Sequence, residues 1–139
     1  MGKETKLQSQ IVVWFSQERP EERGCLFHVS NERNSPLQAF QARAIGIFPG
    51  VADLLYFSRK NNSIHVTGIE VKAKGERHSV DHIKNQVEWG KKICSLGGEW
   101  FLVTSLEQAI NIFNGKKDGL TVDEVEELIS NIKTKTIVF

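Results

Sequence analysis

Apolar residues recur at three- and four-residue spacing in the first segment of the chain, from about Glu4 to Glu18. The resulting stripe consists of four residues: Leu7, Ile11, Trp14 and Phe15. This period predicts an amphipathic helix that buries one face. A second helical pattern begins at Ser79, whose hydroxyl can cap a helix, and reaches about Leu96 before Gly97-Gly98 ends it.

Short apolar runs between these two helices have the composition of β-strands. Four strands are expected, and their ranges are Cys25 to Ser30, Val51 to Phe57, Ile64 to Ala73 and Trp100 to Thr104. The polar link from Ser58 to Ser63 predicts that the second and third strands form a hairpin. Pro36 opens a short inserted helix that reaches about Ile45, because proline is tolerated in the first helical turn.

The last third of the chain continues with helical patterns. A helix is expected from Leu106 to Phe113, and a second one follows the capping box made by Thr121 and Glu124. Thr136 to Phe139 can form an edge strand. The predicted fold is therefore α/β, a single domain with an α-β-β-β-α-β core at about residues 4–104 and a C-terminal helical extension at about 105–139.

Composition narrows the class of protein. The chain has 139 residues, of which 40% are hydrophobic and 25% charged, as in ordinary soluble globular domains. No apolar run is long enough to cross a bilayer and no signal peptide precedes the first helix, so we expect a cytoplasmic protein. Cys25 and Cys94 lack zinc-finger spacing and are expected to be reduced core thiols.

The net charge of +1 conceals an asymmetry along the chain. From Arg59 to Lys92 there are eight Lys or Arg residues against four acids, whereas Ser105 to Phe139 has four against six. A basic middle is compatible with nucleic acid, although a solvated lysine-rich surface gives the same pattern.

Three polar residues stand in otherwise apolar strands. Asp53 lies at the start of one strand, where an unpaired buried carboxylate would be costly, and Glu70 and Lys72 share one face of the next strand. The hairpin would bring that face beside Asp53, and two converging carboxylates can hold Mg²⁺ or Mn²⁺. The alternative is that Glu70 and Lys72 are a solvent-facing pair, which is the usual meaning of an isolated E-x-K.

The two flanking helices also carry polar residues on their apolar faces. Projected at 100° per residue, Glu4 and Gln8 fall on the stripe of the first helix, and Gln86 falls on the inner face of the later one. For Glu4 a second interpretation stays open, in which the helix starts after it and Glu4 is only an acid near the helix N-terminus.

Taken together, these motifs resemble the VRR-NUC family of the PD-(D/E)XK nuclease superfamily, in particular its stand-alone phage and bacterial members. The resemblance covers Glu4 to about Thr104 and consists of five ordered motifs: E-x-x-x-Q at Glu4 to Gln8, N-E-R at Asn31 to Arg33, G-I-F-P-G-V-A-D at Gly46 to Asp53, I-E-V-K at Ile69 to Lys72, and Gln86. Ala52 departs from the pattern, since proline often precedes the aspartate in the family. The extension beyond Thr104 lies outside it.

This resemblance implies a restriction-endonuclease-like core, with a mixed four-stranded sheet flanked by helices, and a metal-dependent DNA endonuclease. Asp53, Glu70 and the Val71 carbonyl would hold the metal, and Lys72 would orient the attacking water. Glu4 would bind a metal-linked water or a second ion, and Gln86 would position the nucleophile or Lys72. The resemblance also implies a homodimer that cuts branched or four-way junction DNA in repair, recombination or phage DNA processing.

Other residues are candidates for contacts with DNA. The basic residues expected to bind its backbone are Arg33, Lys74, Arg77 and Lys84. His78 and His82 have the spacing of helical metal ligands but lack a third ligand, so they are expected to face solvent or a phosphate. Trp89 is the one tryptophan suited to stack on a base, since Trp14 and Trp100 are expected in the core.

Two other functions remain compatible with the sequence. One is a DNA-binding or assembly module that keeps the fold without the chemistry, and the other is a restriction-like nuclease that cuts a defined sequence. Binding of Mn²⁺ would distinguish the first from an active nuclease, and a single cleavage site on plasmid and linear DNA would identify the second.

Overall fold

The computed structural model describes residues 1–30 and 36–139. Its elements follow the expected order: α1 (Lys3–Glu18), the 3-10 helix η1 (Pro20–Glu22), β1 (Leu26–His28), α2 (Pro36–Ala44), β2 (Leu54–Lys60), β3 (Ser63–Val71), β4 (Arg77–Ser79), α3 (Val80–Ser95), β5 (Glu99–Val103), α4 (Leu106–Phe113), α5 (Val122–Ser130) and β6 (Thr136–Val138). The polar turn expected at Asn31 to Ser35 lies outside the described residues.

A mixed four-stranded sheet forms the centre of the molecule, with strand order β1-β2-β3-β5. β2 and β3 form the predicted hairpin, and β5 lies parallel to β3. The hairpin turn consists of Asn61 and Asn62, both with positive φ, as a two-residue turn between twisted strands requires. The expected α/β fold with a mixed sheet between helices is confirmed.

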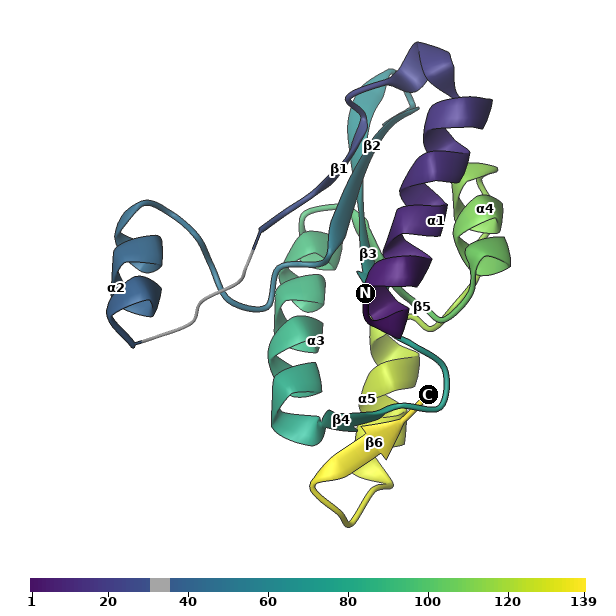
Figure 1. Cartoon of the computed structure of the whole chain (residues 1–139). Helices are drawn as coiled ribbons and strands as arrows, with labels where there is room; N and C mark the ends of the chain where they lie inside the picture. The colour runs from purple at the N-terminus through teal and green to yellow at the C-terminus, as the bar shows by residue number, and fades with distance from the viewer. Residues whose placement is uncertain (31–35) are drawn as a thin grey trace.

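Helices cover both faces of this sheet (Figure 1). On one face, α1 and α4 pack over residues such as Tyr56, Ile69 and Phe101. On the other face, α3 and α5 pack over Trp100 and Leu102. Because β5 is buried on both sides, its side chains alternate between two cores, which explains a continuous apolar strand.

The two strands of the hairpin are offset from the predicted ranges. β2 begins at Leu54 rather than Val51, because Val51, Ala52 and Asp53 form an irregular approach to the sheet. β3 ends at Val71 rather than Ala73. Asp53 therefore precedes its strand, and Lys72 follows the other strand directly.

The C-terminal segment forms more than the expected helices. β6 pairs antiparallel with β4, a strand that the apolar pattern did not predict, and the two make a separate two-stranded sheet. β4 consists of Arg77, His78 and Ser79, so its sequence has no apolar alternation that could have revealed it.

The two cysteines are less buried than the sequence predicts. Cys94 is exposed, which contradicts its assignment to the core: it lies near the C-terminal end of α3 and lines an open pocket beside Trp100. Cys25 is half-buried. No helix within the described ranges is both long and apolar enough to cross a membrane.

Candidate active site

Asp53 and Glu70 lie next to each other across the hairpin. Leu54 pairs with Ile69 in the β2–β3 ladder, so one further step of the register places Asp53 opposite Glu70. The Val71 amide donates a hydrogen bond of 2.8 Å to Asp53 Oδ2. The Asp53 carbonyl accepts from the Val29 amide at 3.2 Å and from His28 Nδ1 at 2.7 Å, so the backbone and side chain of Asp53 are both fixed.

A glycine lets the loop before Asp53 pack closely on α3. Gly50 has φ of +86°, and a Cβ at this position would lie 2.8 Å from the Asn85 carbonyl oxygen of α3. Any side chain would push the loop off the helix. The Pro-Gly loop therefore connects the position of Asp53 to the helix that carries Gln86.

Glu70 is a fully buried carboxylate, with 1% of the residue exposed. Within residues 1–30 and 36–139, neither of its oxygens has a hydrogen-bond partner, although Lys72 Nζ lies 3.3 Å from Oε1 and forms an ion pair with it. Burial, and then the neighbouring Asp53 carboxylate, raise the pKa of Glu70 well above its usual value, against the lowering effect of Lys72. The buried carboxylate thus lacks the hydrogen bonds that normally compensate such a group.

Lys72 and Glu4 lie close to each other beside the Asp53–Glu70 pair. The Lys72 residue is 4% exposed, and its Nζ lies 3.9 Å from Glu4 Oε1. Glu4 is inside α1, in its first turn, with its side chain 37% exposed, so it both begins the helix and points toward the site. Burial raises the pKa of Glu4, and Lys72 opposes that rise.

Gln86 projects from α3 into the interior, as its helical position predicted. The residue is 7% exposed and its Oε1 has no hydrogen-bond partner. Trp89, on the same helix, packs on the sheet, since a Cβ at Gly68 would lie 3.0 Å from its ring. It is half-buried, and stacking of a base on its exposed part stays a prediction.

The basic candidates for DNA contact lie around this site. Lys74 and Arg77 are exposed before and in β4, and Lys84 is exposed on α3. Arg33 lies outside the described residues. Three of the four expected positions are therefore available at the surface.

His78 lies next to Glu4 at the site, whereas its helical spacing with His82 predicted that it faces solvent or a phosphate. Its Nδ1 lies 3.8 Å from Glu4 Oε2, and its ring centroid lies 6.0 Å from that of Phe139. Burial lowers the pKa of His78, and Lys72 lowers it further. Its expected exposure to solvent is wrong because β4 pairs with β6, a long-range contact with no local signal; His82 on α3 is exposed.

The residues present fit a hard divalent cation that keeps most of its water. Across residues 1–30 and 36–139, no group of three His, Cys, Asp or Glu side chains is arranged to hold a metal by itself. Two adjacent carboxylates are nevertheless sufficient for Mg²⁺ or Mn²⁺, which bind through one or two carboxylates plus waters and substrate phosphate. The observation that supports this fit is the burial of the Glu70 carboxylate, whose oxygens have no hydrogen-bond partner within the described residues and only the ion pair with Lys72.

Comparisons with known proteins support the fold. No family model matches the sequence, and no curated protein matches it. A solved structure described as a VRR_NUC domain protein is similar over 87% of this chain and 97% of its own, with a TM-score of 0.62 and 17% sequence identity. The chain therefore has a restriction-endonuclease-like VRR-NUC fold.

Proposed function

We propose that this protein is a Mg²⁺- or Mn²⁺-dependent endonuclease that hydrolyses phosphodiester bonds in DNA. The observation that carries the proposal is the Asp53–Glu70 pair, in which a buried carboxylate without hydrogen bonds lies 3.3 Å from the Lys72 ammonium. Burial of these charged groups lowers the free energy of unfolding, so stability does not account for their presence. Ionisable groups with perturbed pKa values cluster at functional sites.

Each residue would have a distinct role in hydrolysis. Asp53, Glu70 and the Val71 carbonyl would hold the metal, which supplies Lewis acidity and an activated water when bound. Lys72 would orient the attacking water and offset charge on the phosphate, since its ammonium lies between the carboxylates of Glu70 and Glu4.

Two polar residues from the flanking helices would complete the arrangement. Glu4 would accept a hydrogen bond from a water of the metal, or contact a second ion. Gln86 would position the nucleophile or Lys72 with its buried, unpartnered amide oxygen. Arg33, Lys74, Arg77 and Lys84 would bind phosphates on either side of the cleaved bond and give affinity without sequence readout.

Cleavage by two variants tests this mechanism. Asp53→Ala and Lys72→Ala should each lower Mg²⁺- or Mn²⁺-dependent cleavage by at least about 100-fold, because electrostatic and general acid–base groups contribute this much. Asp123→Ala and Lys133→Ala are matched controls, since both residues are exposed and far from the pair in sequence. Cleavage is measured on labelled DNA with Mg²⁺, Mn²⁺ or EDTA.

The outcomes separate the candidate functions. Normal cleavage by both site variants would contradict the mechanism. If the wild type neither cleaves DNA nor binds Mn²⁺ in calorimetry, the chain is a non-catalytic module on a nuclease fold. A single cut at the same place in plasmid and linear DNA would instead indicate a sequence-specific nuclease.

We further propose that the substrate is branched, such as four-way junction DNA, and that the active form is a homodimer. A two-fold dimer suits a symmetric substrate. Large apolar side chains are exposed on α2 and the loop after it, and such patches often mark interfaces: Leu37, Phe40, Ile45 and Phe48. Analytical ultracentrifugation should give twice the chain mass, and cleavage rates should be higher on four-way than on linear DNA.

A further inference from the structure

A second basic surface lies at the end of the sheet that carries the hairpin turn. A cavity of about 320 Å³ there is lined by Arg59 and Lys60 from β2 and by Lys116 and Lys117 from the loop after α4. The two pairs come from segments more than fifty residues apart in sequence. The fold thus gathers four cations that the sequence presents as two separate dipeptides.

The described acids near these four cations make hydrogen bonds to other groups and form no ion pair with them. Glu99 also lines the cavity, and its Oε1 forms a hydrogen bond of 2.8 Å with His65 Nε2. Asp118 accepts hydrogen bonds from Asn111 Nδ2 and the Gly119 amide. Within the part of the chain that the structure describes, none of the four basic residues forms an ion pair, so their positive charge is available to an external anion.

The hollow continues beyond the first cavity. An adjoining cavity of about 520 Å³ shares Tyr56, Ser58 and Arg59 with it and extends to Arg19. Glu22 in this second part is bonded to Arg19 and to the Tyr56 hydroxyl. The two cavities form one open groove, which suits an extended chain of phosphates better than a compact ligand.

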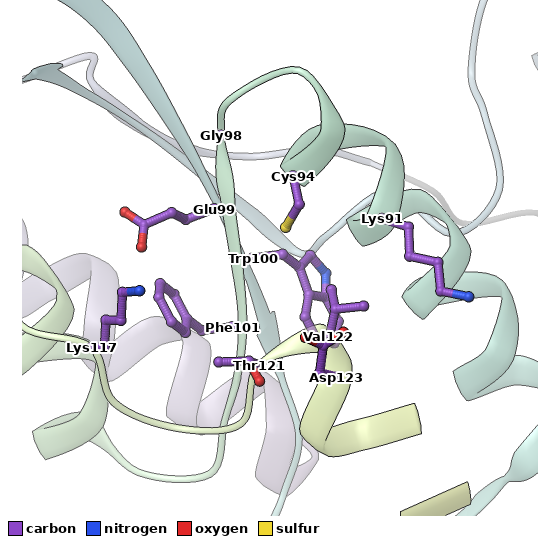
Figure 2. A pocket seen from close by; sticks show the side chains of 10 residues that line it. All are labelled: Lys91, Cys94, Gly98, Glu99, Trp100, Phe101, Lys117, Thr121, Val122 and Asp123. Carbon is purple, nitrogen blue, oxygen red and sulfur yellow. The ribbon is translucent and has the colours of Figure 1, made fainter. Parts of the chain in front are cut away.

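The groove and the side chain of Glu70 lie on different faces of the sheet. Tyr56, Thr67 and Phe101 line the groove and point toward α1 and α4. Figure 2 shows Lys117 on the same side of β5 as Phe101, with Trp100 and Cys94 on the other side. Glu70 alternates with Ile69 and Val71, which point toward α1, so its side chain leaves β3 on the opposite face.

The two sites are also well separated along the strands. β2 spans seven residues from Leu54 to Lys60, which is about 23 Å at 3.3 Å per residue. A straight duplex with a phosphate at Asp53 cannot also lie in a groove on the other face at the far end of the sheet. A molecule with two arms leaving a branch point at different angles can reach both.

We propose that this groove, lined by Arg59, Lys60, Lys116 and Lys117, binds the phosphate backbone of a second arm of branched DNA. The inference rests on the proposed nuclease function and adds the surface that would favour branched over linear substrates. It also gives a role to the Lys116-Lys117 loop in the C-terminal extension.

Binding measurements without cleavage test this surface directly. Two double variants, Arg59→Ala/Lys60→Ala and Lys116→Ala/Lys117→Ala, are compared with Lys133→Ala/Lys135→Ala, which removes the same charge from exposed positions before β6. Affinity for a labelled four-way junction and for a linear duplex is measured by fluorescence anisotropy in EDTA, at several salt concentrations.

Each groove variant should bind the four-way junction roughly ten-fold more weakly and reduce its salt slope by about 2, since one phosphate contact contributes about 1. Affinity for the linear duplex should change little, and the Lys133/Lys135 control should leave both unchanged. Circular dichroism establishes that the variants are folded; because all four side chains are exposed, we expect native melting.

Several results would overturn the proposal. Equal losses on linear and branched DNA, or an equal loss in the control, would mean that the groove contributes only general charge. Displacement of branched DNA by polyglutamate at matched charge would assign the groove to an acidic protein. Metal-dependent cleavage by the wild type is scored separately: cleavage without these binding differences refutes the groove alone, whereas no cleavage refutes the proposed function.

Discussion

At the scale of single residues, Glu70 is a buried carboxylate whose surroundings do not favour folding stability. A buried carboxylate normally accepts hydrogen bonds that stabilise its charge, whereas Glu70 has only the ion pair with Lys72 among the described residues. The desolvated oxygens therefore hold a proton more tightly than an exposed glutamate would. Binding of a cation would displace this proton, so the group is costly without a metal and suited to one.

The raised pKa of Glu70 predicts a particular pH dependence of stability in the metal-free protein. The unfolded carboxyl titrates near its ordinary value of about 4.3, so at higher pH the folded state binds more protons than the unfolded state. Stability should then fall as pH rises above that value, with a slope of up to about 1.4 kcal/mol per pH unit, until Glu70 ionises in the folded state. Glu70→Gln should lack this decline.

Urea denaturation in EDTA between pH 5 and 8 measures the effect. The matched control is Glu127→Gln, because Glu127 is exposed on α5. Parallel pH profiles for wild type and Glu70→Gln would show that Glu70 is charged and compensated in the folded protein. The control should follow the wild type.

Individual site residues differed in how far the sequence could predict them. Gln86 was predictable because a helix projects each side chain at a known angle, and its burial follows. His78 was not, because its neighbours Glu4 and Phe139 come from opposite ends of the chain. Cysteine is usually buried, which predicts Cys94 in the core, but Cys94 is exposed in an open pocket near the end of α3.

At the scale of elements, boundaries followed local signals where those existed. α4 occupies the predicted residues Leu106–Phe113 because Ser105 caps its start, and α5 begins at Val122, directly after Thr121 of the Thr121–Glu124 capping box. The predicted range of β2 was wrong by three residues at each end, because Val51 to Asp53 do not pair whereas the polar residues Ser58 to Lys60 do. β3 ends two residues before the predicted Ala73. β4 exists only through its pairing with β6, and such long-range pairing is not encoded in the local pattern.

The loop between α2 and β2 offers a test of how elements position Asp53. Gly50→Ala should lower both stability and cleavage, because its Cβ would meet the α3 backbone and shift the residues that lead to Asp53. Gly46→Ala is a matched control: its φ is +97°, but its Cβ would meet nothing within 4 Å. Both variants should lose about 1–2 kcal/mol from the positive φ.

Gly50→Ala should lose about 1–3 kcal/mol more, as overpacked positions do. Its cleavage rate should also fall, whereas Gly46→Ala should retain the wild-type rate. Urea denaturation and cleavage of four-way DNA measure the two effects. If the two variants behave alike in both, the close packing of Gly50 on α3 does not control the position of Asp53.

At the scale of the whole molecule, the segment from Ser105 onward belongs to both cores. Ala109, Ile112 and Phe113 pack with α1 on one face of the sheet. Val122 and Val125 pack with α3 on the other face. The apolar pattern suggested an extension added to a complete core, because the packing partners of a helix cannot be read from its own periodicity.

The same packing predicts that residues 1–104 do not fold without the rest of the chain. Removing 105–139 would expose the partners of five large buried side chains: Ile112, Phe113, Val122, Val125 and Ile137. Each contributes about 1.5–3 kcal/mol by burial, so their combined loss is comparable to the whole stability of an ordinary domain, about 5–15 kcal/mol. The shortened chain should therefore show no cooperative thermal transition in circular dichroism.

Full-length Ile137→Ala, which removes one of these contacts, should remain folded and lose about 2–5 kcal/mol. A shortened chain that melts cooperatively within a few degrees of the full one would mean that the sheet, α1 and α3 form a sufficient core, and that the C-terminal segment serves the groove and β4 without holding the fold.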